Sequence, residues 1–185
     1  MDVTKLRAAT AADHDAVESS MPLMDPHLDR NAYTAVLLQL RPLIAAWETL
    51  LHEQAPPILK PLVEPRCRLA LLDQDLVALG AHPAPSVAPH LPSLNTSAHL
   101  YGAMYVMEGS RLGGQFIARH IDSLFPEVHA TRYFRGFDSR TGPMWKEFLH
   151  LLEEQVPDQD TDDVIAGARL MFKTFGDWMR QAPAP

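Results

Sequence analysis

The sequence predicts an all-α fold, a multi-helix bundle in a single domain over residues 1–185. Apolar residues recur at helical spacing in at least five segments of the chain. No stretch of the sequence shows the period-two alternation between turn signals that is typical of a β-hairpin. A chain of 185 residues can bury roughly 70% of its unfolded surface around one core, so a second domain is not expected.

Two helices are predicted in the first third of the chain. One covers about residues 3–19 and ends at the turn over residues 21–26, because the two prolines of that turn discourage helix continuation. The next covers about residues 31–52 after a cap at Asp29. Pro42 lies inside this second helix and predicts a kink there.

The later helices follow a proline-rich connection. A third helix, over residues 65–79, stops at Gly80, and the prolines of residues 81–94 predict a stiff surface segment. A long helix then runs from a cap at Asn95 or Thr96 to about residue 123. Two more helices, with Thr141 and Thr161 as caps, are expected over residues 143–155 and 162–180.

Composition argues against several classes of protein. The net charge is −7 and no dense Lys/Arg block contains aromatic residues, so nucleic-acid binding is not expected. No apolar run reaches the roughly 18 to 20 residues that span a bilayer, so membrane insertion is not expected either. The single cysteine, Cys67, and an N-terminus without a signal-peptide pattern predict a cytoplasmic location.

The first helix carries a stripe of chemically useful side chains. Arg7, His14 and Glu18 share one face, because they are seven and four residues apart. An imidazole is a good ligand for iron, and a carboxylate one turn away can hold its second ring nitrogen. Arg7 could then pair with a carboxylate of the same cofactor. A solvated ion pair is the ordinary alternative, and a zinc or di-iron site is disfavoured because the sequence has no second Glu-x-x-His set.

Three glycines lie within the fourth predicted helix. Gly109, Gly113 and Gly114 each cost about 1 kcal/mol relative to alanine in a helix interior, so they need a reason. One possible reason is tight helix packing. A phosphate-binding loop is disfavoured because no strand precedes the motif. A kinked helix with a flat macrocycle against it fits better. Ser110 and Arg111 would then be the polar side chains nearest to the open position of the iron.

Two segments on separate helices carry a recognisable pattern. They are residues 6–18, LRAATAADHDAVE, and residues 108–115, EGSRLGGQ. Together with residues 133–137, YFRGF, and 142–148, GPMWKEF, they resemble the haem oxygenases over about residues 5–179. The first two segments are similar to the proximal and distal helices of that family, and most similar to its bacterial branch associated with bacteriophytochromes.

The resemblance implies where haem would bind. His14 is expected to be the axial ligand of the haem iron, with Glu18 as its hydrogen-bonding partner. Gly109, Gly113 and Gly114 are expected to form the distal surface against the macrocycle. Further haem contacts are implied for Arg7 and Lys146, near the propionates, and for Phe172 and Phe175 of the last helix.

Ser110 departs from many family members, which carry an aspartate at this position. In those proteins the aspartate organises a distal water network, so Arg111 or a residue from another helix is expected to compensate here. The resemblance assigns a catalytic role to Gly109, Ser110 and Gly113.

The activity that the resemblance implies is the opening of haem, as both substrate and cofactor, to biliverdin, carbon monoxide and ferrous iron. The sequence has no flavin or nicotinamide motif and no iron–sulfur cysteine set, so the electrons are expected from an external ferredoxin or reductase. The basic residues from Arg111 to Lys146 would steer an acidic donor, and a bacteriophytochrome could receive the product. The alternatives are a haem-sequestering or sensing protein and a helical bundle that does not bind haem.

Overall fold

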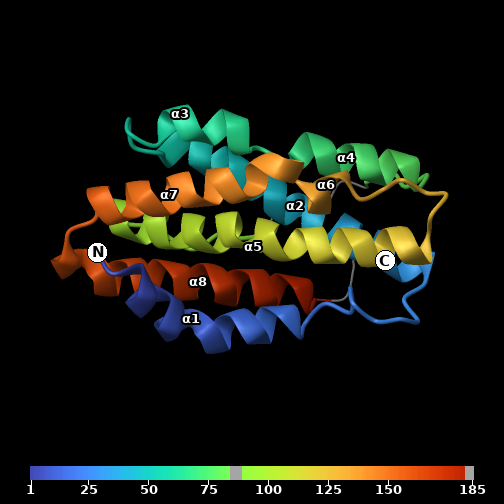
Figure 1. The fold of residues 1–185 in the computed structure, drawn as a ribbon, viewed down its shortest axis with the longest axis horizontal. Coiled ribbons are helices and arrows are strands. Elements are labelled where there is room, and N and C mark those ends of the chain that lie inside the picture. The colour runs from blue at the N-terminus through green and yellow to red at the C-terminus, as the bar shows by residue number, and fades with distance from the viewer. Residues whose placement is uncertain (84–88, 182–185) are drawn as a thin grey trace.

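A computed structural model describes residues 1–83 and 89–181, and every regular element in these ranges is helical (Figure 1). The α-helices are α1 (Val3–Glu18), α2 (Arg30–Gln54), α3 (Lys60–Val63), α4 (Leu69–Ala78), α5 (Ser97–Leu124), α6 (Arg132–Arg135), α7 (Thr141–Gln155) and α8 (Thr161–Met179). The 3₁₀ turns are η1 (Glu64–Arg66), η2 (Asp138–Arg140) and η3 (Asp158–Asp160). The all-α prediction is confirmed. None of these helices combines the length and the apolar character needed to cross a membrane.

Helix starts that depend on local capping agree with the sequence. The side chains of Asp29 and Thr96 cap α2 and α5, each accepting the backbone N–H three residues further on, at 2.8 and 3.1 Å. The predicted caps Thr141 and Thr161 are wrong, because η2 and η3 lead directly into α7 and α8 and make each threonine the first helical residue. The helix α2 continues without a break through Pro42.

The segment between α2 and α5 also differs from the prediction. The helix expected over residues 65–79 is interrupted, because Cys67 is extended and α4 begins only at Leu69. A side chain from α2 caps α4: Glu48 Oε1 accepts the backbone N–H groups of Arg68 and Leu69, at 2.5 and 2.9 Å. Part of the predicted proline-rich connection, residues 84–88 with Pro85, lies outside the described residues.

The helix α5 is central to the fold. It lies between α7 and α8, and α1 lies along α8 at the edge of the molecule (Figure 1). Two glycines allow α5 and α8 to pack backbone to backbone. A Cβ at Gly102 would be 2.0 Å from the carbonyl oxygen of Val164, and a Cβ at Gly167 would be 2.2 Å from that of His99. This contact fixes the position of α5 relative to α8, and α1 in turn packs along α8.

Candidate functional site

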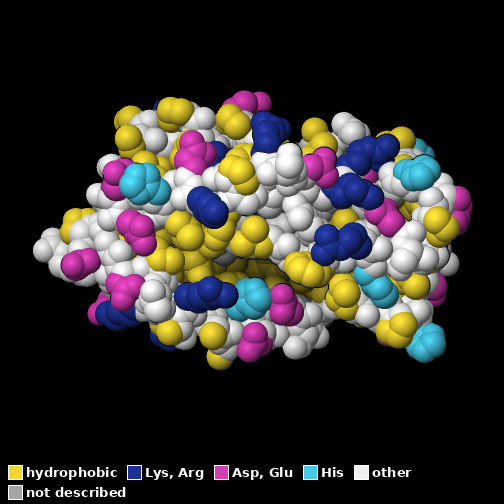
Figure 2. Space-filling model, in the orientation of Figure 1, with side chains coloured by type: hydrophobic (Ala, Val, Ile, Leu, Met, Phe, Trp, Pro, Cys, Tyr) yellow, Lys and Arg dark blue, Asp and Glu magenta, His cyan; other side chains and the backbone are white. Residues whose placement is uncertain are grey.

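A hollow with a hydrophobic floor opens between α1 on one side and α5 and α7 on the other (Figure 2). Basic, histidine and acidic side chains stand on its α1 rim, and a basic side chain stands on the rim over α7 (Figure 2). His14 and Glu18 are exposed residues of α1, and Lys146 is an exposed residue of α7. The hollow therefore lies between the two segments that the sequence singled out.

His14 presents a half-exposed ring on α1. Its Nε2 atom lies 3.7 Å from Glu18 Oε1, and its Nδ1 atom lies 3.7 Å from Asp15 Oδ1. Both distances exceed hydrogen-bond length, so the expected hydrogen bond between His14 and Glu18 is not formed in this structure and stays a prediction. Phe172 of α8 packs edge-on against the imidazole, with ring centroids 6.0 Å apart. One side of the imidazole is thus supported by an aromatic ring, and neither ring nitrogen is fixed by a carboxylate.

The three predicted distal glycines face different neighbours. At Gly113 the atom nearest to an added Cβ would be Glu18 Oε1, at 4.0 Å, so this position opens toward α1. At Gly109 an added Cβ would meet the Trp145 ring at 3.6 Å. At Gly114 it would come within 2.6 Å of a backbone carbonyl oxygen of α6. Gly114 therefore has a packing reason to be glycine, whereas the space at Gly113 is not filled by the protein.

An aromatic group that the sequence did not indicate lies beside these glycines. The ring of Tyr105 lies 5.3 Å from that of Trp145, which stacks on Phe148 at 6.0 Å. Burial raises the pKa of Tyr105, and the guanidinium of Arg7 opposes this shift. Arg7 is therefore close enough to α5 to act on Tyr105 electrostatically. Tyr105 lies one turn before Gly109, so the i, i+4 spacing could have identified it.

The helix α5 also exposes two large apolar side chains next to the glycines. Leu112 is 39% exposed and Phe116 is 64% exposed. Together with Gly109 and Gly113 they follow the i, i+3, i+4, i+7 spacing of one helix face. Such a stripe usually packs on a core, so its exposure here leaves apolar surface for a ligand to cover.

The hydroxyl group of Ser110 is held by a buried arginine from another segment. Ser110 Oγ donates a hydrogen bond to the carbonyl oxygen of Met107 at 2.8 Å and accepts one from Arg68 Nη2 at 3.3 Å. The guanidinium of Arg68 is buried and lies 4.5 Å above the centre of the Tyr133 ring. The interruption between η1 and α4 places Arg68 there, and no pattern in the sequence indicates this contact.

The side chain of Arg111 belongs to a buried ionic cluster, and Arg68 rather than Arg111 holds the Ser110 hydroxyl. Glu108 Oε1 lies 2.7 Å from Arg111 Nη2, and Glu108 Oε2 lies 3.2 Å from Arg66 Nε. Burial lowers the pKa of Arg111 to about 10, and repulsion from Arg68 adds to this shift. Burial also raises the pKa of Glu108, and the two partner arginines oppose the rise. The cluster ties α5 to η1, close to the glycines.

The basic residues from Arg111 to Lys146 do not form one charged surface. Arg111 is buried, and Arg132 and Arg135 form ion pairs with aspartates. Basic side chains nevertheless gather on the face that carries the hollow, over α5 and α6 (Figure 2). Only part of the stretch is therefore free to attract an acidic partner.

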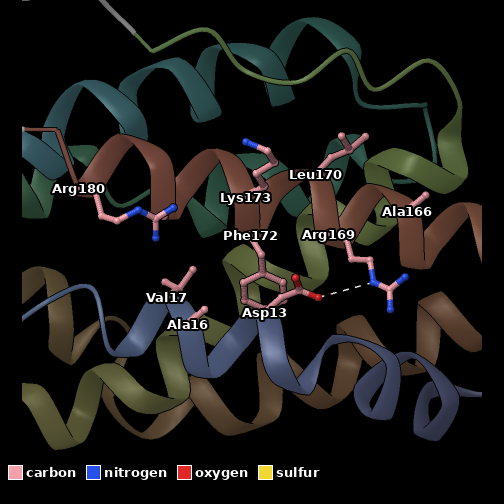
Figure 3. A pocket seen from close by; sticks show the side chains of 10 residues that line it. Asp13, Ala16, Val17, Ala166, Arg169, Leu170, Phe172, Lys173 and Arg180 are labelled. Carbon is pink, nitrogen blue, oxygen red and sulfur yellow. Dashed lines mark ion pairs between the residues drawn. The ribbon is translucent and has the colours of Figure 1, made fainter.

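A second groove, of about 570 Å³, lies along α1 and α8 (Figure 3). Val17, Leu170 and Phe172 supply apolar lining, and Arg169 lies at its edge, with Nε 3.6 Å from Asp13 Oδ2. His14 does not line this groove, although Phe172 contacts both. Phe175, one turn from Phe172 on α8, is buried.

The chain is similar to known proteins over most of its length. The family model described as "Heme oxygenase" matches residues 2–181. A protein named "Heme oxygenase" from Xanthomonas campestris pv. campestris (strain 8004) is 33% identical over 151 residues, which cover 80% of this chain and 89% of that protein. "Heme oxygenase PigA" of Pseudomonas aeruginosa is 25% identical over 180 residues, 96% of this chain and 90% of that protein.

The fold is similar to that of a solved protein as well. The crystal structure of the NO- and CO-bound heme oxygenase from Neisseria meningitidis superposes with a TM-score of 0.77 at 25% sequence identity. The match covers 96% of this chain and 89% of that one.

Proposed function

This chain belongs to the haem oxygenase family, and we propose that haem binds in the hollow between α1 and α5, with His14 as the axial ligand of its iron. The enzyme is a haem oxygenase, which opens haem to biliverdin, carbon monoxide and ferrous iron with dioxygen and external electrons. The observation that supports this binding site is that the two motifs, residues 6–18 and 108–115, approach each other across the hollow. The open space at Gly113 is bounded by Glu18, one turn beyond His14.

The residues around the hollow fit haem. The floor is apolar, as a porphyrin requires, and the glycine face of α5 lets a flat ring lie against the backbone (Figure 2). A Cβ at Gly113 would enter the space that the ring needs. The stripe of Leu112 and Phe116 would lose its exposure to water when the ring covers it.

The α1 side would hold the iron. One nitrogen of the His14 imidazole would ligate the iron, and the other would turn to the carboxylate of Glu18, whose Oε1 atom lies 3.7 Å from Nε2 in this structure. Phe172 limits rotation of the imidazole by its edge-on contact. The exposed Arg7 and Lys146 would pair with the propionates from the two rims, and the buried Phe172 and Phe175 of α8 would help to close the pocket.

The α5 side would control the distal space. Bound haem supplies the iron that activates dioxygen and the porphyrin edge that is oxidised. Gly109 and Gly113 bring no titratable side chain to this space. The Ser110 hydroxyl donates to the carbonyl oxygen of Met107, and its oxygen would accept a hydrogen bond from a distal water. Arg68 donates a hydrogen bond to the same hydroxyl oxygen and would help to hold it beside the distal space.

The remaining parts of the proposal rest on the motifs. We propose that a ferredoxin or reductase supplies the electrons and approaches the basic side chains beside the hollow (Figure 2). The similarity to the branch associated with bacteriophytochromes supports a bacteriophytochrome as the recipient of biliverdin. The single cysteine is consistent with work in the cytoplasm.

The test is a titration with haemin, followed by ascorbate or a ferredoxin system under air. We expect a Soret band that decays while a red biliverdin band and carbon monoxide appear. His14→Ala should weaken haem binding and abolish turnover. His150→Ala is a matched control, because His150 Nε2 and Glu154 Oε1 form the same i, i+4 pair on α7, at 3.2 Å, and it should behave as the wild type. A stable Soret band without biliverdin would indicate a haem-binding protein, and the absence of any Soret band would contradict the proposal.

A further inference from the structure

Three potential metal ligands converge where α2 ends and η1 leads to α4. Cys67 Sγ lies 3.7 Å from His52 Nε2, and Glu64 Oε2 lies 3.6 Å from the same nitrogen. All three ligand atoms lie within 4.8 Å of one another. We propose that His52, Glu64 and Cys67 bind one thiophilic divalent cation, Zn²⁺, at a site separate from the haem hollow.

The separations agree with those between the ligands of one tetrahedral zinc ion. A zinc–sulfur bond of about 2.3 Å and a zinc–nitrogen bond of about 2.0 Å, at the tetrahedral angle, place sulfur and nitrogen about 3.5 Å apart. The measured distance between Cys67 Sγ and His52 Nε2 is 3.7 Å. A thiolate, an imidazole and a carboxylate are a donor set that zinc accepts, and water would complete the tetrahedron. Small side-chain adjustments are therefore enough to close the site.

The local backbone explains the convergence. Glu64 and Cys67 are joined by the single 3₁₀ turn η1, in which side chains at i and i+3 lie above one another. The backbone N–H of Cys67 donates to the carbonyl oxygen of Glu64 at 3.2 Å and fixes this turn. His52 comes from the last turn of α2, where the partial negative charge of the helix end favours a cation. The cation would thus join two separate segments of the chain.

Cys67 has the chemistry that this role requires. It is the only cysteine in the chain, half-buried, and it forms no disulfide. The thiolate that would bind the cation forms when the thiol releases its proton to solvent, so cation binding displaces one proton. Cys67 also lies between Arg66 and Arg68, whose side chains reach Glu108 and Ser110 of α5. A bound cation would therefore brace the segment that holds these arginines.

The test uses Co²⁺ as a spectroscopic substitute for Zn²⁺ on the full, haem-free chain. One equivalent should give a thiolate-to-cobalt charge-transfer band and the visible bands of tetrahedral cobalt, and Zn²⁺ should abolish both. Because the chain has one cysteine, the charge-transfer band reports this site alone. Cys67→Ser should remove the band.

Zinc affinity, measured by competition with a chromophoric chelator, tests the other two ligands. His52→Ala should weaken Zn²⁺ binding by more than about 100-fold and Glu64→Gln by at least about tenfold, since even loss of a ligand's hydrogen-bonding neighbour costs roughly 10- to 100-fold. His14→Ala is the control, because His14, Asp15 and Glu18 are another group that could hold a metal, and it should leave the band unchanged. No charge-transfer band in the wild type, or a Zn²⁺ affinity that is unchanged in both His52→Ala and Glu64→Gln, would overturn the proposal.

Discussion

Two pairs of positions in α5 are occupied by glycine for different reasons. Added Cβ atoms at Gly102 and Gly114 would lie 2.0 and 2.6 Å from backbone carbonyl oxygens of α8 and α6. At Gly109 and Gly113 they would meet only side chains, at 3.6 and 4.0 Å. Each glycine costs about 1 kcal/mol relative to alanine, and close backbone packing offsets this cost only in the first pair. The atoms that an added Cβ would meet, rather than the spacing of the glycines, distinguish a glycine required for packing from one that leaves space for a ligand.

The largest effect is expected for Gly102→Ala. Its Cβ would overlap the Val164 carbonyl oxygen, so α5 and α8 would have to move apart. We expect a loss of about 3 kcal/mol or more in the free energy of unfolding, because two packed backbones cannot yield as a side chain can. Urea unfolding of the haem-free protein, followed by circular dichroism, measures this. A loss below about 1 kcal/mol would remove the contrast between the two pairs.

Gly114→Ala should have a smaller effect of the same kind. The clashing carbonyl belongs to α6, which has only four residues and can shift more easily than α8. We expect a loss of about 1 to 3 kcal/mol in the free energy of unfolding. The same urea experiment tests it, and a stability equal to that of the wild type would show that α6 does not constrain this position.

Gly113→Ala should reverse the pattern. The added methyl group meets no protein atom closer than Glu18 Oε1, so the free energy of unfolding should stay equal or rise by up to about 1 kcal/mol. Haem affinity should fall about tenfold, because the methyl group occupies the space assigned to the macrocycle. A haemin titration followed at the Soret band measures this, and unchanged affinity would place the ring elsewhere.

Gly109→Ala should have the smallest effect. Its Cβ would make ordinary contact with the Trp145 ring at 3.6 Å. The free energy of unfolding should rise by up to about 1 kcal/mol, and haem affinity should fall less than in Gly113→Ala. Parallel urea and haemin experiments on the two variants test the order. A larger loss of affinity in Gly109→Ala would make Gly109 the closer contact.

The sequence predicted the parts of the fold that depend on local signals. Asp29 and Thr96 cap their helices because each acts on a backbone group three residues away. The start of α4 depends on Glu48 of α2, which is distant in sequence, so local patterns could not locate it. Thr141 and Thr161 have the residue type of a cap, but the preceding 3₁₀ turns continue into the helices and leave the capping position to another residue.

The candidate site likewise has parts that local sequence patterns could predict and parts that depend on tertiary packing. The spacing of His14 and Glu18 on one helix, and of the glycines on another, was readable from the sequence. Which glycine faces α1 depends on how α5 packs against three other helices. This packing places Gly114 against α6. Arg68 reaches Ser110 only because the helix is interrupted just before α4. No spacing rule could therefore have connected the two residues.

A crystal structure of the haemin complex tests the central claim most directly. We predict that a nitrogen of His14 ligates the iron, that the ring lies against the Gly113 face of α5, and that Phe116 is covered. The groove along α1 and α8, lined by Val17, Leu170 and Phe172, should remain free of haem. Haem in that groove, or an iron that His14 does not ligate, would contradict the account.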